Sequence, residues 1–217
     1  MCGIISLAGN PVSTKSLSGA LDVLSHRGPD THDVWKSPSG MCAMGHKRLS
    51  IIDLTEAGRQ PMSDEAGRYH IALNGEIYNY IELRKELKAN YKFKTSTDTE
   101  VLLAAYAKWG SSCLEKLIGM FAFVVWDEKS RTLFAGRDRF GVKPIYYTTL
   151  PGGELALVSE IKAAHTLGVA QEPDETTWAG YLAYGLYEHS ERTFWKGIKP
   201  LMPGHALLWK GGKLQIW

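Results

Sequence analysis

The chain has 217 residues, of which 44% are hydrophobic, and a formal net charge of +2. This composition is sufficient for one substantial core, and the scattered Lys and Arg residues argue against nucleic acid or an anionic membrane as a partner. No apolar run is long enough for a transmembrane helix, and the N-terminus lacks the basic segment of a signal peptide. Three cysteines are too few for a disulfide framework, so we expect a cytoplasmic protein.

Apolar alternation and turn residues predict short strands in both halves of the chain. The two glycines at positions 211–212 are expected to join the last two strands in a hairpin. The strands are expected over residues 2–9, 41–46, 69–73, 119–126, 131–135, 145–149, 154–159, 205–210 and 213–217.

Helices are expected between these strands. Ser13 is available as the N-cap of a helix over residues 14–25, and capping patterns begin at Asn79 and at Thr97. Residues 176–184 also have a helical pattern. Helices mixed with hairpin-linked strands favour an α+β fold with antiparallel sheets over a regular βαβ repeat.

Cys2 is the candidate nucleophile because it directly follows the initiator methionine. Removal of Met1 would leave a thiol and an α-amino group on one residue. The amine has a reference pKa of about 8 and the thiol one of about 8.5, so the amine can relay the thiol's proton. The alternative is that Cys2 packs in a strand as a small hydrophobic residue, as we expect for Cys42 and Cys113.

A series of short motifs follows in order along the chain. They lie at residues 1–4, 26–30, 46–53, 60–62, 74–79, 97–100, 119–123, 136–141 and 159–163. In this order and spacing they resemble the class II glutamine amidotransferase domain of glutamine-hydrolysing asparagine synthetases. The resemblance extends from Met1 to about Ala163 and is weaker beyond.

The resemblance implies a four-layer α-β-β-α sandwich of two antiparallel sheets, the N-terminal-nucleophile hydrolase fold. It implies one domain over residues 2–217, with a core at 2–165 and a helix plus hairpin at 166–217. This last segment would lead towards a C-terminal synthetase domain that residues 1–217 do not include. That domain would use ATP and Mg²⁺, whereas no cofactor or metal is expected here, because the histidines lack metal-ligand spacing. A homodimer is left open.

The resemblance also implies hydrolysis of L-glutamine to glutamate and ammonia, which the synthetase domain would consume. Cys2 would attack the side-chain amide. The side chain of Asn74 and the N–H group of Gly75 would donate hydrogen bonds to the oxyanion. A glycine suits this position, since a bare backbone can approach the substrate closely.

The substrate's charged groups would be held by three further side chains. Arg48 would bind the α-carboxylate with its planar guanidinium, and Asp98 would bind the α-ammonium group with help from Glu76. The segment 26–30 is expected to order a loop near Cys2. Backbone groups would line the pocket at Leu49, Ser50, Ile51 and Ile52.

Simpler interpretations exist for the same residues. Arg48 could be a surface arginine, Asp98 could only favour a helix dipole, and Asn74 with Gly75 could form a type I′ hairpin turn. Three rival functions also stay open. They are another class II amidotransferase, an asparagine-synthetase-like enzyme with a different acceptor, and a non-catalytic domain with the same fold.

Overall fold

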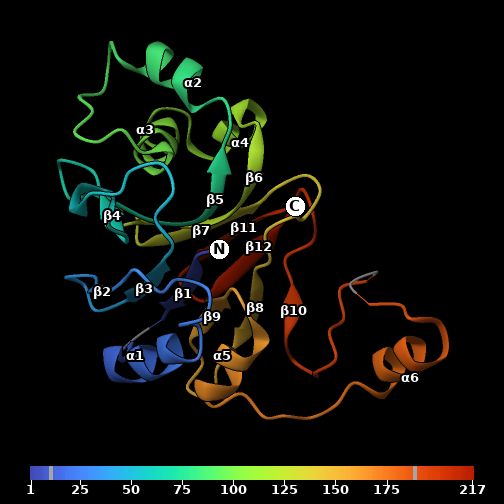
Figure 1. The fold of residues 1–217 in the computed structure, drawn as a ribbon. Coiled ribbons are helices and arrows are strands. Elements are labelled where there is room, and N and C mark those ends of the chain that lie inside the picture. Colours follow the sequence, from blue (N-terminus) through green and yellow to red (C-terminus); the bar gives the residue numbers. More distant parts are fainter. Residues whose placement is uncertain (10–11, 188–189) are drawn as a thin grey trace.

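The protein folds into two antiparallel sheets that pack face to face (Figure 1). The structure is a computed structural model that describes residues 1–9, 12–187 and 190–217. The first sheet has the order β10 (Lys199–Pro200), β8 (Tyr146–Thr149), β9 (Leu155–Val158), β1 (Gly3–Ala8), β3 (Cys42–Arg48) and β2 (Thr31–Lys36). The second has the order β12 (Lys213–Ile216), β11 (Ala206–Lys210), β7 (Thr132–Arg137), β6 (Gly119–Asp127), β5 (Tyr69–Ile77) and β4 (Met62–Ser63).

Helices cover the outer face of each sheet (Figure 1). The first sheet is covered by α1 (Thr14–Asp22) and α5 (Ile161–Thr166). The second is covered by α2 (Tyr80–Leu87), α3 (Asp98–Trp109) and α4 (Cys113–Lys116). The remaining helices are α6 (Glu175–Tyr184), which lies to one side, and the short 3₁₀ helices η1 (Glu56–Gly58) and η2 (Gly110–Ser112). No helix in the described ranges is long and apolar enough to cross a membrane.

Three buried hydrophobic clusters separate the four layers. One packs α2 and α3 against the second sheet, one lies between the sheets, and one packs α1 and α5 against the first sheet. Because side chains alternate along a strand, Ile71 and Leu73 of β5 face the helices, whereas Ala72 faces the first sheet. The expected four-layer α-β-β-α sandwich is confirmed.

Most of the expected elements are present with shifted ends. The helix expected over residues 14–25 ends at Asp22. Ser13 occupies the N-cap position, as expected, but its side chain makes no cap hydrogen bond. The cap at Thr97 is confirmed, because its Oγ1 accepts a hydrogen bond of 3.1 Å from the Glu100 N–H. Cys42 and Cys113 are fully buried, as expected of structural cysteines.

The sheets differ from the expectations in several places, including the two-residue strands β4 and β10, which were not expected. β2 was not expected, because an edge strand with only alternate residues half-buried carries little apolar pattern. The hairpin-turn interpretation of Asn74 and Gly75 is wrong, since both lie within β5 and pair with Ala122 and Phe121 of β6. Gly75 is required there by close contact: with φ of +154°, an added Cβ would lie 2.2 Å from the Met120 carbonyl oxygen.

Gly28→Ala is expected to lower the free energy of unfolding by at least about 2 kcal/mol, measured by urea denaturation. An added Cβ would lie 2.2 Å from the Lys47 carbonyl carbon, so the segment 26–30 would have to move away from β3. The control is Gly19→Ala in α1, where an added Cβ meets no atom within 4 Å. Gly19→Ala should raise the free energy of unfolding by roughly 0.5–1 kcal/mol. Equal stability of Gly28→Ala and the parent would contradict this packing.

Candidate active site

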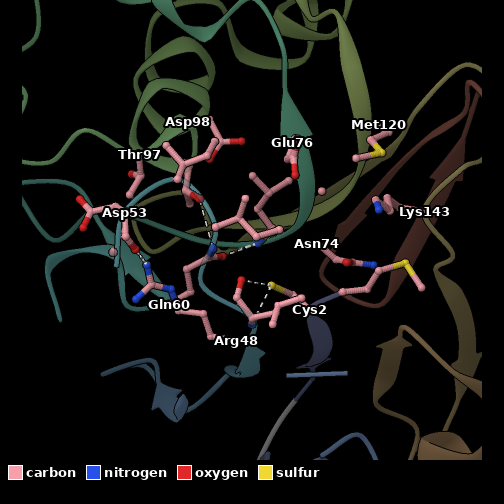
Figure 2. A pocket seen from close by; sticks show the side chains of 18 residues that line it. Cys2, Arg48, Asp53, Gln60, Asn74, Glu76, Thr97, Asp98, Met120 and Lys143 are labelled. Atoms are coloured by element: carbon pink, nitrogen blue, oxygen red, sulfur yellow. Dashed lines mark hydrogen bonds between the residues drawn. The ribbon is translucent and has the colours of Figure 1, made fainter. Parts of the chain in front are cut away.

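A cavity of about 210 Å³ lies where the start of β1 meets the edge of β5 (Figure 2). Every predicted site residue except Ser50 lines it. Ser50 lies outside the lining, and its backbone N–H donates a 2.7 Å hydrogen bond to the Asp30 carboxylate. The predicted residues in the lining are Cys2, Arg48, Leu49, Ile51, Ile52, Asn74, Gly75, Glu76 and Asp98.

The Cys2 thiol is held against the end of β3. Its Sγ accepts a hydrogen bond from the Leu49 N–H at 3.4 Å and lies 3.7 Å from the Leu49 carbonyl oxygen. Burial raises the pKa of the Cys2 thiol, although the Leu49 hydrogen bond and nearby positive charges act in the opposite direction. A thiol with a raised pKa stays protonated at neutral pH, so its reaction requires a base within reach.

Within the segment 26–30, which was expected to order a loop near Cys2, Arg27 holds the backbone of Cys2 itself. Arg27 Nε donates a 2.8 Å hydrogen bond to the Cys2 carbonyl oxygen, and Arg27 Nη1 donates one of 2.8 Å to Glu160. Although burial raises the pKa of Glu160, hydrogen bonds from Arg27, His26 and Lys162 lower it to about 2. Glu160 is therefore ionised at neutral pH, and it holds Arg27 beside the first strand.

Asn74 is fully buried, and its side-chain amide has no hydrogen-bond partner among the described residues. A buried polar group without a partner typically costs about 1–3 kcal/mol. By strand alternation Asn74 is on the same face as Ala72, towards the sheet that carries Cys2. The cavity wall thus presents an unsatisfied amide donor close to the thiol (Figure 2).

The N–H group of Gly75 adds a second donor on this wall. The Leu73 N–H donates to Gln60 Oε1 at 2.6 Å, and the Ile77 N–H donates to Asp98 Oδ2 at 2.9 Å. Both groups therefore point away from β6. Since backbone groups alternate along a strand, the Gly75 N–H points to the same edge, where the cavity lies.

One end of the cavity is acidic. Asp98 begins α3 and is only 5% exposed, and Glu76 lines the same cavity. Burial raises the pKa of the Asp98 carboxyl, and the nearby charge of Glu76 raises it further. No cationic side chain in the described ranges pairs with Asp98. This end is therefore suited to a cationic group of a ligand.

Arg48 holds the loop that follows β3, and this loop forms another wall of the cavity. Its side chain is only 6% exposed, so the interpretation as a surface arginine is wrong. The guanidinium donates to the carbonyl oxygens of Asp53 and, at 3.0 Å, Thr55. These contacts occupy two of its five N–H donors. Gly58 packs closely over it, since an added Cβ there would lie 2.2 Å from Arg48 Nη2.

The cavity also contains residues that the sequence analysis did not assign. Several lie in the motifs quoted above, although no role was given to them there, whereas Gly58, Leu73 and Lys143 lie outside those motifs. Among the described residues, no three His, Cys, Asp or Glu side chains are grouped to hold a metal ion. The unassigned lining residues are Met1, Asp53, Gly58, Gln60, Leu73, Thr97, Thr99, Met120 and Lys143.

Asp98→Asn is expected to leave the protein at least as stable as the parent at pH 7. The pKa of Asp98 is higher in the folded than in the unfolded state, so ionisation at neutral pH opposes folding. Asparagine keeps an oxygen acceptor for the Ile77 N–H without the charge. Any advantage should shrink as the pH falls through the raised pKa, because Asp98 is then protonated. Urea denaturation at pH 7 and pH 4 measures the free energy of unfolding of both proteins. A markedly lower value for Asp98→Asn than for the parent at pH 7 would contradict the destabilising effect assigned to the Asp98 charge.

Comparison with known proteins agrees with this geometry. The chain is 42% identical to Asparagine synthetase (glutamine-hydrolyzing) 3 of Bacillus subtilis, over all of this chain and 36% of that protein. It is 36% identical to Amidase chry2 of Gibberella zeae, over 96% of this chain and 32% of that protein. The chain therefore spans about a third of the length of the curated relatives that it matches.

A solved structure shares the fold. Glutamine phosphoribosylpyrophosphate amidotransferase from B. subtilis superposes with a TM-score of 0.76 at 18% identity, over 100% of this chain and 49% of that chain. The family model described as "Glutamine amidotransferase domain" matches residues 1–216. Since the match covers nearly the whole chain, the protein belongs to the glutamine amidotransferase domain family.

Proposed function

We propose that the chain hydrolyses L-glutamine to glutamate and ammonia, with Cys2 as the nucleophile once Met1 has been removed. The observation that carries this proposal is the fully buried Asn74 amide, which lacks a protein partner and lines the same cavity as the Cys2 thiol. A folded protein retains such a costly donor where a ligand supplies the missing acceptor.

The cavity matches the two charges of a free amino acid. Asp98, with Glu76, would bind the α-ammonium group, and donors of Arg48 that the loop does not occupy would bind the α-carboxylate. Backbone groups of the loop that follows Arg48 would complete the wall. The γ-carboxamide would then extend towards Cys2 and the two oxyanion donors.

In the first half of the reaction, the Cys2 amine takes the thiol's proton while sulfur bonds to the carboxamide carbon. The carbonyl electron pair moves to oxygen, where Asn74 and the Gly75 N–H stabilise the charge. The amine then gives the proton to the leaving nitrogen. Ammonia departs as the C–N bond breaks, and a glutamyl thioester remains.

In the second half, water attacks the thioester and the amine takes one of its protons. The C–S bond breaks, glutamate leaves, and the proton returns to the thiolate. The raised pKa of the Cys2 thiol makes this amine necessary, because the protonated thiol is a poor nucleophile.

For the whole protein, we propose that the ammonia is consumed by a C-terminal synthetase domain that uses ATP and Mg²⁺ to convert aspartate to asparagine. The relatives support this, since several are named asparagine synthetases and are about three times as long as this chain. Residues 166–217 would lead to that domain, and the location would be cytoplasmic. The similarity to Amidase chry2 keeps a different acceptor as the second candidate.

Glutamate release by the purified chain tests the hydrolysis directly. We expect steady turnover by the parent and none by Cys2→Ala. Asn74→Ala should lower kcat by about 10²–10³-fold, the effect of losing one oxyanion donor. Its free energy of unfolding should not fall by more than about 1 kcal/mol, because the variant also removes two unsatisfied buried atoms.

Two controls accompany this experiment. Intact mass should show that the active protein begins at Cys2, and the thiol of Asn74→Ala should still react with iodoacetamide at the parent's rate. Equal turnover by Cys2→Ala and the parent, or activity in a preparation that fully retains Met1, would refute the proposal.

A further inference from the structure

Among the residues that the structure describes, no strand pairs with the edge of β5 at the cavity. β4 pairs with β5 only at His70 and Ile71, and the backbone groups of Leu73 lie beyond it. Two side chains take the place of a strand there. Gln60 Oε1 accepts the Leu73 N–H at 2.6 Å, and His46 Nε2 lies 3.0 Å from the Leu73 carbonyl oxygen.

Both side chains are buried, and each contacts a backbone group of Leu73. Gln60 is 8% exposed, and its Nε2 donates a 3.1 Å hydrogen bond to Thr99 Oγ1 at the start of α3. His46 is fully buried on β3 of the other sheet. Burial lowers the pKa of His46 to about 4, so the ring is neutral at neutral pH. Because a carbonyl oxygen only accepts, Nε2 must carry the ring proton.

Leu73, whose backbone groups these two side chains contact, directly precedes the two oxyanion donors. Asn74 and Gly75 follow Leu73 on one continuous strand, so a displacement of Leu73 also displaces the Asn74 amide and the Gly75 N–H. Such donors are effective only if they lie about 2.7–3.1 Å from the oxyanion position. Gln60 thus links this edge of β5 to the start of α3, and His46 links it to the first sheet.

We propose that Gln60 and His46 are positioning residues that set the oxyanion hole by holding both backbone groups of Leu73. This inference rests on the proposed glutamine hydrolysis. In this role, Gln60 and His46 do not contact the reacting atoms. Their removal should weaken stabilisation of the tetrahedral intermediate and leave binding of the α-amino and α-carboxylate groups intact.

The aldehyde analogue of glutamine, with a γ-aldehyde in place of the carboxamide, reports on the hole itself. The Cys2 sulfur bonds reversibly to the aldehyde carbon, and the carbonyl electron pair moves to oxygen. The thiol's proton passes to the amine or to that oxygen. Glutamate carries the same α-groups without this addition. The ratio of the two affinities therefore separates the oxyanion hole from the amino-acid pocket.

We expect Gln60→Met and His46→Leu each to weaken binding of the aldehyde by about tenfold or more. Inhibition constants for glutamate should stay within about twofold of the parent. For glutamine turnover, kcat should fall and KM should change little. Thr99→Val removes the hydroxyl that holds Gln60 and should produce a smaller change in the same direction.

Two variants separate positioning from a loss of stability. His46→Gln keeps an amide N–H that can reach the Leu73 carbonyl, so it should recover most of the aldehyde affinity that His46→Leu loses. Val125→Ala creates a cavity in the buried core of β6, on the helix side. It should lower the unfolding midpoint and leave the aldehyde-to-glutamate affinity ratio unchanged.

An unchanged ratio in both Gln60→Met and His46→Leu would overturn the inference. An equal loss of aldehyde and glutamate affinity would also overturn it. So would a fall in the aldehyde-to-glutamate affinity ratio of Val125→Ala as large as that of Gln60→Met. If the parent does not release glutamate and Cys2 does not bind the aldehyde, the proposed function itself fails and this inference with it. A parent that turns over glutamine beside variants with the parent's ratio would refute the positioning role alone.

Discussion

The site depends on the way in which two sheets bring the start of one strand against the unpaired edge of another. β1 begins at Gly3, so Cys2 immediately precedes it, and Leu49, the residue that follows β3, donates its N–H to the Cys2 sulfur. In the opposite sheet, β5 continues past the short strand β4. The backbone N–H groups along that free edge are therefore available to side chains and to a ligand. Cys2 precedes a strand of the first sheet, whereas Asn74 and Gly75 lie on β5 of the second, and the two sheets pack face to face (Figure 1).

The cavity retains several groups that are unfavourable in the folded protein. Within the part of the chain that the structure describes, the buried Asn74 amide has no hydrogen-bond partner and the buried Asp98 carboxylate has no paired cation. Each would find its complement in a zwitterionic amide substrate. The rest of the site is well satisfied: Arg48 and Gln60 bond to backbone groups, and Arg27 bonds to Cys2 and Glu160. Unpaired groups at the ligand positions and paired groups around them are the pattern expected of a preorganised site.

The four layers were implied by the family resemblance, whereas the apolar patterns alone predicted buried strands better than edge strands. Buried strands such as β1 and β6 carry continuous apolar patterns, and Thr97 carries a clear capping signal. β2 has no such pattern because one side of it faces solvent. Local chemistry favoured a turn at Asn74 and Gly75, whereas pairing with β6, which is distant in sequence, places both inside a strand.

The site residues were predictable only as members of recognised motifs. In the folded protein, all the residues predicted from those motifs except Ser50 line one cavity. They could not assign Gln60 or His46, because the need for both arises from a missing neighbour strand that no local pattern reveals. Ser50 was expected to line the pocket, but its N–H is directed to Asp30, a contact that depends on the loop's path.

In the proposed reaction the Cys2 sulfur carries the acyl group of the substrate, and the free α-amine of the same residue transfers the protons. Rapid acid quenching during glutamine turnover, followed by peptide mass spectrometry, tests this assignment. We expect a mass increase of one glutamyl group on Cys2, on a peptide that begins at Cys2. A glutamyl group on any other residue, or on a peptide that still begins with Met1, would contradict it.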